Sequence, residues 1–329
     1  MTGNTTSLSA PGNERLMTRR RRRAELGLFA AIVLVLLLAP LVMNPFVVMK
    51  IMCFAMFALA LNLLMGFTGI VSFGHAMFFG GGAYVGGHAI KAFGWPLEAG
   101  IVLAAAAAAL LGLGTGVLAV RRHGIYTAMV TLAFAQMLLF LAIQAPFTGG
   151  EDGLQSIPRG YFLGLLDTRN EFQLFLATLI LFVAGFLIVF RTVHSPFGQT
   201  LKAIRENETR AISLGYRTNR YKLAAFVLSA ALSGAAGAMK AVVFELASLT
   251  DVSWHTSGEV VLMNLVGGIG TMLGPIAGAA TIIGIQEFLS GIEDWILVIN
   301  GVIFVVVVIA FRKGIVGEIA GFLARREGR

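Results

Sequence analysis

Two apolar stretches of this 329-residue chain contain polar and glycine residues where a membrane helix ordinarily has few. The stretch 62–87, NLLMGFTGIVSFGHAMFFGGGAYVGG, holds eight glycines together with Asn62 and His75, and the stretch 266–275, VGGIGTMLGP, holds four glycines and a proline. Amide, hydroxyl and free backbone groups of this kind form hydrogen bonds with a polar solute or with a neighbouring helix. Neither His75 nor His88 has a metal-ligating partner at a useful spacing, so the pattern indicates hydrogen bonding and not a metal site.

The composition of the chain places both stretches in a membrane. Hydrophobic residues make up 57% of the sequence, charged residues only 13%, and the mean hydropathy is +0.84, which excludes a soluble globular protein. Apolar runs of about 20 residues, long enough to cross a hydrocarbon core of about 30 Å, recur along the chain. The single cysteine, Cys53, can neither form an internal disulfide nor complete a metal site. We therefore predict an all-α, polytopic membrane protein without redox chemistry.

The first 25 residues predict a basic cytoplasmic tail. Five arginines, Arg19 to Arg23, directly precede the apolar run Leu26 to Met43, as in a signal peptide. No small-x-small cleavage site follows, so we expect an uncleaved first helix. Positive charge keeps the amino terminus in the cytoplasm, and this explains the arginine run without a nucleic-acid partner.

The charges between apolar runs set the topology. Arg121 and Arg122 and the basic stretch 191–222 fall inside, while the acidic loop around Glu151 falls outside. The segment 259–289 needs an even number of crossings, because the basic tail 312–329 follows the last helix. We expect about eight membrane helices within a permease domain over 26–311, near 26–43, 46–66, 70–93, 97–119, 125–146, 173–191, 222–244 and 292–311, with a cytoplasmic loop over 192–221.

The glycine-rich stretches predict breaks in two membrane segments. Proline lacks an amide proton and glycine disfavours helix, so 259–289 is expected to form a broken, re-entrant helical hairpin. Irregular backbone inside a bilayer survives only where protein or water satisfies it, and paired interruptions indicate a translocation pathway, which we expect near the midplane. Both breaks follow an asparagine-leucine pair. The expected pathway residues are Asn62, Gly66, Thr68, Gly69, Ser72, Gly74, His75, Asn264, Gly267, Gly268, Gly270, Thr271, Gly274 and Pro275.

Structural roles are the alternative for each of these residues. Small residues also let membrane helices pack closely without any solute. His75 and His88 are either polar groups of the pathway or donors of one interhelical hydrogen bond. For Lys240 we expect a side chain that extends outward toward Glu245 or the lipid headgroups.

The stretch 195–222, SPFGQTLKAIRENETRAISLGYRTNRYK, predicts a helix in the cytoplasm. Ser195 suits the helix cap, Pro196 its first position, and Gly215 the left-handed residue just past its end. The cytoplasmic helix would run near 196–214, over about 18 residues.

The side chains of that helix predict two different faces. Leu201, Ile204, Ala211 and Ile212 recur at helical spacing, and Lys202, Glu206 and Arg210 are four residues apart on a charged face. Such a helix lies either on anionic lipid or in a protein groove. Its mixed charges favour a protein groove.

Three motifs give the chain a family resemblance. LNLLMGFTGIVSFGHAMFFGGGAYVGG, the loop SPFGQTLKAIRENETRAISLGYRTNRYKLAAFVLSAALSGAAGA and the late motif GGIGTMLGPIAGA resemble the LivM-type permease subunits of branched-chain amino-acid ABC importers. In such importers the loop inserts a coupling helix into a cleft of the ATPase subunit. The resemblance implies this role for Ile204, Arg205, Glu206, Asn207, Glu208, Arg210, Ala211 and Gly215. The usual E-A-A pattern with a later glycine is degenerate, since Thr209 and Arg210 replace its first two positions.

The resemblance also implies a division of labour between chains. None of the six lysines precedes a serine or threonine, so the chain lacks the phosphate-binding loop of an ATPase. We expect no enzyme activity and no cofactor on this chain, with ATP and Mg bound by two ABC ATPase subunits. The other implied partners are a second, LivH-like permease subunit, a periplasmic substrate-binding protein and the lipid bilayer of a bacterial inner membrane.

Two other functions are compatible with the residues. An ion-gradient-driven secondary transporter or channel would usually carry acidic or histidine relays inside the bilayer, and this chain has few candidates. A membrane scaffold would use the glycines for packing alone. The sequence leaves the substrate open among branched-chain amino acids and related small amino acids, amides or carboxylates.

Overall fold

The computed structural model describes residues 11–41, 43–122 and 124–288, with Gly301 and Gly314. They belong to two compact units, 1–43 and 44–329, which we treat separately. In the first unit, α1 (Pro11–Leu38) continues into a short 3-10 turn, Ala39–Leu41. The helix predicted for 26–43 is thus present but begins earlier, so that the arginine run is part of it. The helix predicted for 292–311 lies outside the described residues.

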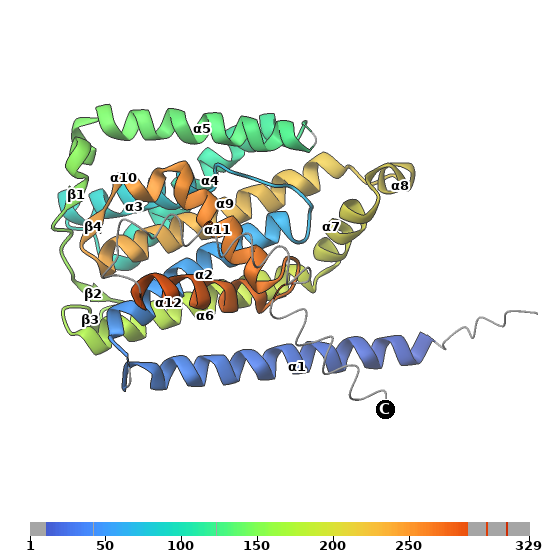
Figure 1. Ribbon diagram of the computed structural model, residues 1–329, viewed down its shortest axis with the longest axis horizontal. Helices are drawn as coiled ribbons and strands as arrows, with labels where there is room; N and C mark the ends of the chain where they lie inside the picture. The colour runs from blue at the N-terminus through green and yellow to red at the C-terminus, as the bar shows by residue number, and fades with distance from the viewer. Residues whose placement is uncertain (1–10, 42, 123, 289–300, 302–313, 315–329) are drawn as a thin grey trace, which may run out of the picture. The chain divides into compact units, whose positions relative to one another are not determined.

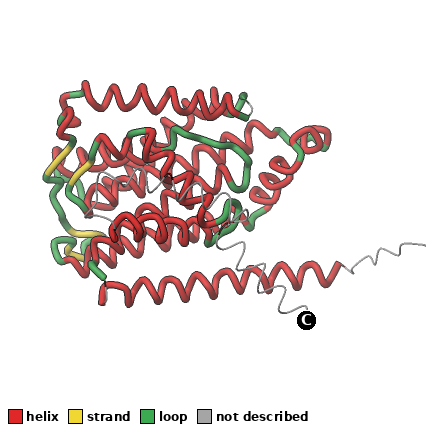
Figure 2. The backbone as a smooth tube through the Cα atoms, viewed as in Figure 1, coloured by secondary structure: helices red, strands yellow, loops and turns green. Residues whose placement is uncertain are grey.

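The second unit is helical, with two short strand pairs at one end (Figures 1 and 2). Its helices are α2 (Pro45–Met65), α3 (Ala76–Phe93), α4 (Leu97–Ala119), α5 (Ile125–Gln144), α6 (Glu171–Val193), α7 (Pro196–Glu206), α8 (Glu208–Ser213), α9 (Thr218–Val243), α10 (Leu249–Val252), α11 (Trp254–Gly267) and α12 (Gly274–Phe288). Strand β1 (Leu154–Gln155) pairs antiparallel with β4 (Leu246–Ala247), and β2 (Tyr161–Phe162) pairs antiparallel with β3 (Leu166–Asp167). Two 3-10 turns, Pro146–Thr148 and Gly150–Asp152, precede β1.

Among the described residues, five helices are long and apolar enough to cross a membrane, namely α2, α4, α5, α6 and α9. In an apolar stretch of 18 residues, 89% of the residues are buried in α2 and 78% in α9, but only 28% in α5. Helices α2 and α9 therefore form the centre of the unit, and α5 exposes an apolar surface, as a helix in contact with lipid does.

Glycines let α3 and α9 approach closely. A Cβ added to Gly86 would lie 2.8 Å from the Cβ of Ala238, and one added to Gly82 or Gly237 would overlap the backbone of the facing helix. These glycines lie inside continuous helix, so the packing alternative holds for the second half of the stretch 62–87.

Lys240 does not extend outward as expected. Its Nζ donates to Asp251 Oδ2 at 2.7 Å, and the two side chains are 12% and 6% exposed. Asp251 lies in α10, where the same carboxylate oxygen accepts from the Ser248 amide and forms a capping box. The ion pair therefore fixes α10 on the end of α9 near the strands. His88 lies half-buried at the same end, with its ring edge against Phe93 and Phe147.

Candidate functional site

The first break separates α2 from α3 over residues 66–75. The Gly66 amide donates to the Asn62 carbonyl at 2.7 Å, and Gly69 has a φ of 77°, which ends the helix. Thr68 reinforces the turn, since its Oγ1 donates to the Leu64 carbonyl at 2.5 Å. The predicted start of the next helix at residue 70 is therefore wrong, and α3 begins at Ala76.

The position of this break differs from the expected midplane. Helix α2 contains 21 residues before Gly66, which at 1.5 Å per residue is about 32 Å, the full thickness of a hydrocarbon core. The first break thus lies at the end of a full-length helix and not in the middle of one.

The second break lies where the sequence predicts it. Helix α11 ends at Gly267 and α12 begins at Gly274, with left-handed φ values of 115° at Gly268 and 78° at Gly270 between them. Thr271 closes the turn, because its Oγ1 donates to the Gly268 carbonyl at 2.8 Å and accepts from the Gly274 amide at 3.0 Å. Pro275 follows in the first turn of α12, where its missing amide proton costs no hydrogen bond.

Helices α11 and α12 pack against each other as the two arms of a hairpin. A Cβ added to Gly267 or Gly278 would overlap the backbone of the opposite arm, at Gly274 and Met263 respectively. Farther from the break, Gln286 Nε2 donates to Glu259 Oε1. The arms contain 14 and 15 residues, and each is about 21 to 23 Å long, shorter than a membrane span.

Asn62 joins the two breaks directly. Its Nδ2 donates to the Thr271 carbonyl at 2.7 Å, and its Oδ1 accepts from the Gly270 amide at 2.9 Å. The side chain is fully buried, and Gly66 leaves the space for this contact, since a Cβ there would lie 2.7 Å from the Gly270 nitrogen. We call the residues of the two breaks together with Asn62 the junction.

Asn264, the matching asparagine of the second break, has a different role. Its Nδ2 donates to the Val260 carbonyl of its own helix at 2.9 Å. Its buried Oδ1 has no hydrogen-bond partner among the described residues. The two asparagine-leucine pairs are therefore alike in sequence but not in contacts.

His75 forms hydrogen bonds with two serines, one of them on another helix. Its Nε2 lies 2.7 Å from Ser229 Oγ of α9, and its Nδ1 lies 3.1 Å from Ser72 Oγ. Because the Ser229 hydroxyl itself donates to the Ala60 carbonyl of α2, it accepts from a protonated Nε2. The structure thus supports the hydrogen-bonding alternative for His75, with more than one bond.

Polar side chains from other helices hold the rest of the first break in place. The Ala76 amide donates to Ser257 Oγ of α11 at 2.9 Å, and the Phe73 amide donates to Thr131 Oγ1 of α5 at 3.3 Å. A Cβ on Gly74 would overlap the Thr131 backbone. Sequence reasoning missed Ser229, Ser257 and Thr131, although isolated hydroxyls in apolar helices are a usable signal of interhelical bonds.

The loop 192–221 begins and ends its helical part as predicted but is broken in the middle. Ser195 Oγ accepts from the Gly198 amide at 3.3 Å, Pro196 follows, and Gly215 has a φ of 88°. The single helix predicted for 196–214 is wrong, because Asn207 has an extended backbone, ends α7 and caps α8 through its side chain. The proposed pairing of Glu206 with Arg210 on one helix face is lost for the same reason.

The break divides the loop into an attached and an exposed part. Leu201, Ile204 and Ala211 are buried as predicted, whereas Ile212 is 56% exposed, which is contrary to expectation. Leu214 is 71% exposed and lies beside it in sequence. Among the exposed polar side chains here are those of Glu206, Asn207 and Arg210. Glu208 holds α8 to α9 through an ion pair with Lys222 at 2.6 Å.

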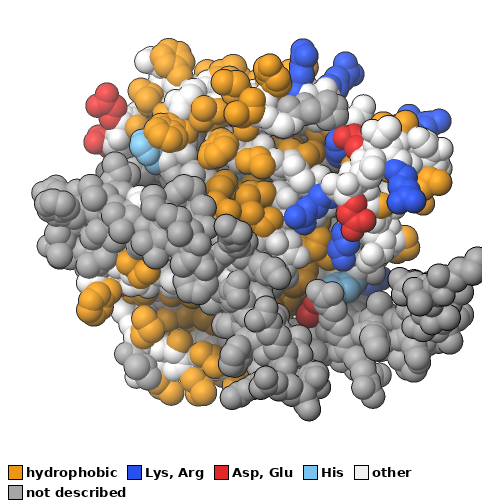
Figure 3. All heavy atoms as spheres, turned by 45° about the vertical axis from the view of Figure 1, so that its right-hand side comes forward, with side chains coloured by type: hydrophobic (Ala, Val, Ile, Leu, Met, Phe, Trp, Pro, Cys, Tyr) orange, Lys and Arg blue, Asp and Glu red, His pale blue; other side chains and the backbone are white. Residues whose placement is uncertain are grey.

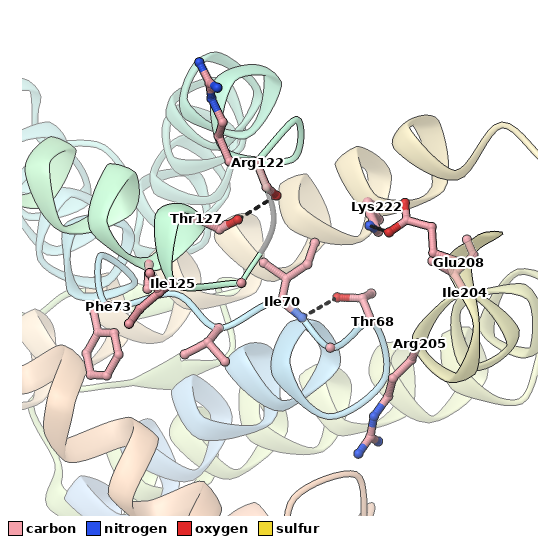
Figure 4. Close-up of a pocket in the computed structure, with 14 residues that line it drawn as sticks. Thr68, Ile70, Phe73, Arg122, Ile125, Thr127, Ile204, Arg205, Glu208 and Lys222 are labelled. Carbon is pink, nitrogen blue, oxygen red and sulfur yellow. Dashed lines mark hydrogen bonds and ion pairs between the residues drawn. The ribbon is translucent and has the colours of Figure 1, made fainter. Parts of the chain in front are cut away.

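A cavity of about 500 Å³ is lined by residues of α7 and of the first break (Figure 4). Its walls come from the first break, the turn between α4 and α5, the loop helices and the start of α9. The lining residues are Thr68, Gly69, Ile70, Val71, Phe73, Arg122, Gly124, Ile125, Thr127, Ala128, Ile204, Arg205, Glu208 and Lys222. Figure 4 shows Arg205 extending from α7 away from Glu208 and Lys222, which pair on the other side.

Arg205 connects the loop to the first break. Its Nη1 donates to the Gly66 carbonyl. The basic side chains visible in Figure 3 gather toward the end of the unit that carries α7 and α8, and hydrophobic side chains cover much of the rest of that view. The loop therefore contacts the junction at the charged end of the unit.

Comparison with known proteins assigns the family. Residues 43–310 match the family described as branched-chain amino acid transport system / permease component. The chain is 27% identical to the high-affinity branched-chain amino acid transport system permease protein LivM of Salmonella typhimurium and of Escherichia coli, over 80% of this chain and 68% of each relative. It is also 27% identical to the ribose import permease protein RbsC of Bacillus subtilis, over 88% of this chain and 91% of the relative. No solved structure matches. The chain belongs to the family of permease components of branched-chain amino acid transport systems.

Proposed function

We propose that this chain is the membrane subunit through which an ATP-driven importer passes a branched-chain amino acid, or a related small amino acid, amide or carboxylate, into the cell. The observation that carries the proposal is the junction, in which Asn62 bonds both breaks and the loop reaches the same place through Arg205. The similarity to LivM supports this substrate class. The similarity to a ribose permease shows that the relatives of this chain serve different solutes.

The proposed topology places both termini in the cytoplasm of a bacterial inner membrane. In it α11 and α12 form a re-entrant hairpin that enters from outside and returns to the same side. Their lengths of 14 and 15 residues and their close packing support this arrangement. The basic residues that follow support it also, because they favour an even number of crossings between α9 and the last helix.

The proposed energy source is a pair of ABC ATPase subunits that bind ATP and Mg, with no cofactor on this chain. They would contact α8 and the turn after it, where Ile212, Leu214 and Tyr216 are exposed next to basic side chains. Exposed apolar groups with a charged rim suit a protein surface better than solvent. A second, LivH-like permease subunit and a periplasmic binding protein would complete the assembly.

The proposed mechanism is alternating access around the junction. ATP-driven movement of the loop would shift the two breaks together, because the Asn62 bonds join them. A zwitterionic solute needs partners for both its charged ends, and helix termini supply about half an elementary charge each without an ionised side chain. The end of α11 and the start of α12 meet at the second break and offer one terminus of each sign.

Proteoliposomes test this function directly. The chain reconstituted with its ATPase, permease and binding-protein partners should take up labelled leucine only when ATP is enclosed with the ATPases. Uptake by the chain alone under an ion gradient would instead support a secondary transporter. Wild-type uptake after deletion of residues 200–215 would refute the role of the loop. Calorimetry on the binding protein encoded beside this chain would identify the solute.

The turn of the hairpin tolerates some substitutions better than others. Replacing Gly267 and Gly268 with leucine would force side chains into the backbone of Gly274 and a left-handed position, so the hairpin itself would distort. Thr271→Val is a milder probe, because it removes two turn hydrogen bonds at nearly constant volume. Uptake should fall in the assembled complex. Thr281→Val, which removes one bond within α12, is the control.

A further inference from the structure

Arg205, in helix α7 of the loop 192–221, lies next to both breaks. Its Nη1 donates to the Gly66 carbonyl in the first break. A Cβ placed on Gly69 would lie 3.2 Å from Arg205 Cγ, and one placed on Gly270 would lie 2.9 Å from Arg205 Nη1. One side chain thus contacts the first break with its stem and reaches the second with its guanidinium group.

The acceptor of this hydrogen bond is suited to a cation. Gly66 is the residue that ends α2, and the last carbonyls of a helix lack partners within the helix and carry partial negative charge. Other protein groups occupy the neighbouring carbonyls, since Asn62 O accepts from the Gly66 amide and Leu64 O from the Thr68 amide. Arg205 therefore supplies a donor that the turn itself does not provide for Gly66 O.

The helix that carries Arg205 is placed to move with the loop. Asn207 is the one extended residue between α7 and α8, and its side chain caps α8, so a displacement of α8 pulls directly on the end of α7 that carries Arg205. The cavity of about 500 Å³ next to α7 leaves space for such a movement. At the other side, the Asn62 bonds make the two breaks a single body.

We propose that Arg205 is a positioning residue that transmits movement of the cytoplasmic loop to both breaks, and that it acts inward on this chain and not on the ATPase surface. The proposal rests on the proposed ATP-driven function of the loop. It assigns different tasks to two arginines of that loop. Both side chains are exposed, but Arg205 donates to the Gly66 carbonyl and moves the junction, whereas Arg210 on α8 faces the partner.

The test compares Arg205→Gln with Arg220→Gln, an exposed arginine in the first turn of α9. Both are made in the reconstituted complex, with Cys53→Ser and a single bimane-labelled cysteine replacing Phe73 of the first break. ATP binding should change bimane emission in the parent and in Arg220→Gln. In Arg205→Gln this change should be lost, uptake should fall about tenfold or more because a charge-assisted bond is removed, and ATP hydrolysis and subunit assembly should persist.

Each other result contradicts the proposal. A preserved ATP-dependent emission change and coupled uptake in Arg205→Gln would overturn it, and so would loss of ATPase subunits from the complex, which would place Arg205 in the docking surface. If Arg205→Gln does not insert, Arg205→Lys takes its place. Because lysine keeps the charge, this variant should show part of the emission change of the parent, and the full change or no change at all would overturn the proposal. The emission readout needs no transported solute, so absent uptake in the parent would refute the proposed function separately.

Discussion

The bridge formed by Asn62 predicts a large difference between two asparagines that the sequence presents as equivalent. Asn62 and Asn264 are both fully buried, and both precede a leucine and a glycine break. Asn62 makes two hydrogen bonds to a segment more than 200 residues away, whereas Asn264 makes one bond within its own helix. Truncation to alanine leaves a similar cavity in both cases, so the difference isolates the bridge.

The expected magnitude follows from the groups left behind. Asn62→Ala leaves the Gly270 amide and the Thr271 carbonyl, both in half-buried residues, without their partner. An unsatisfied buried group costs about 1 to 3 kcal/mol, and access of water places these two toward the lower end. Partial relaxation brings the expected loss from the bridge to about 2 to 4 kcal/mol of unfolding free energy. For Asn264→Ala we expect a loss of about 1 kcal/mol or less beyond the cavity, because its Oδ1 has no partner to lose among the described residues.

The chain contains its own reporter for this measurement. Cys53 is the only cysteine and is buried in α2, so a thiol-reactive dye reports unfolding of the purified subunit on heating. A difference of about 2 kcal/mol corresponds to a difference in Tm of about 3 °C for a chain of this size. Equal Tm values for the two variants would refute the bridge.

Four further substitutions test other parts of the structure. Lys240→Met leaves the buried Asp251 without its cation and should cost about 3 to 5 kcal/mol, and adding Asp251→Asn should recover most of it in the same thermal assay; no recovery would show that the charges are not paired. Gly237→Ala forces a methyl group into the backbone of α3 and should cost about 1 to 3 kcal/mol. Gly114→Ala, with open space around it, should be neutral or stabilising, and a larger loss there would contradict the packing. Ile212→Asp, at an exposed position, should change the unfolding free energy of the subunit by no more than about 0.5 kcal/mol but reduce co-purification of ATPase subunits. Full co-purification would remove Ile212 from that surface.

Local chemistry made several features predictable from the sequence. The break at 266–275 and the ends of the loop helices over 196–214 depend on glycine, proline and serine acting on their immediate neighbours. These signals need no tertiary information. The apolar runs likewise predict helices, and five helices of the described chain are long and apolar enough to span a membrane.

The sequence-based predictions that were wrong depend mostly on contacts between distant segments. The partner of Asn62 lies 208 residues away, and nothing in the spacing of the asparagine-leucine pairs indicates that only one of them would form a bridge. Asn207 interrupts a pattern that reads as one amphipathic helix, although an asparagine followed by an acidic residue is a recognisable helix start. The position of the first break depends on the full length of α2, which the glycines alone do not reveal.

Alternating access around the junction requires that the junction change its exposure to water when a partner binds ATP. A single cysteine replacing Ile269 in the second break, in a Cys53→Ser background, can be titrated with a membrane-impermeant thiol reagent in the assembled complex. We predict a reaction rate from one face of the membrane that changes several-fold between the nucleotide-free and ATP-bound states. An identical rate in both states, from both faces, would contradict the account.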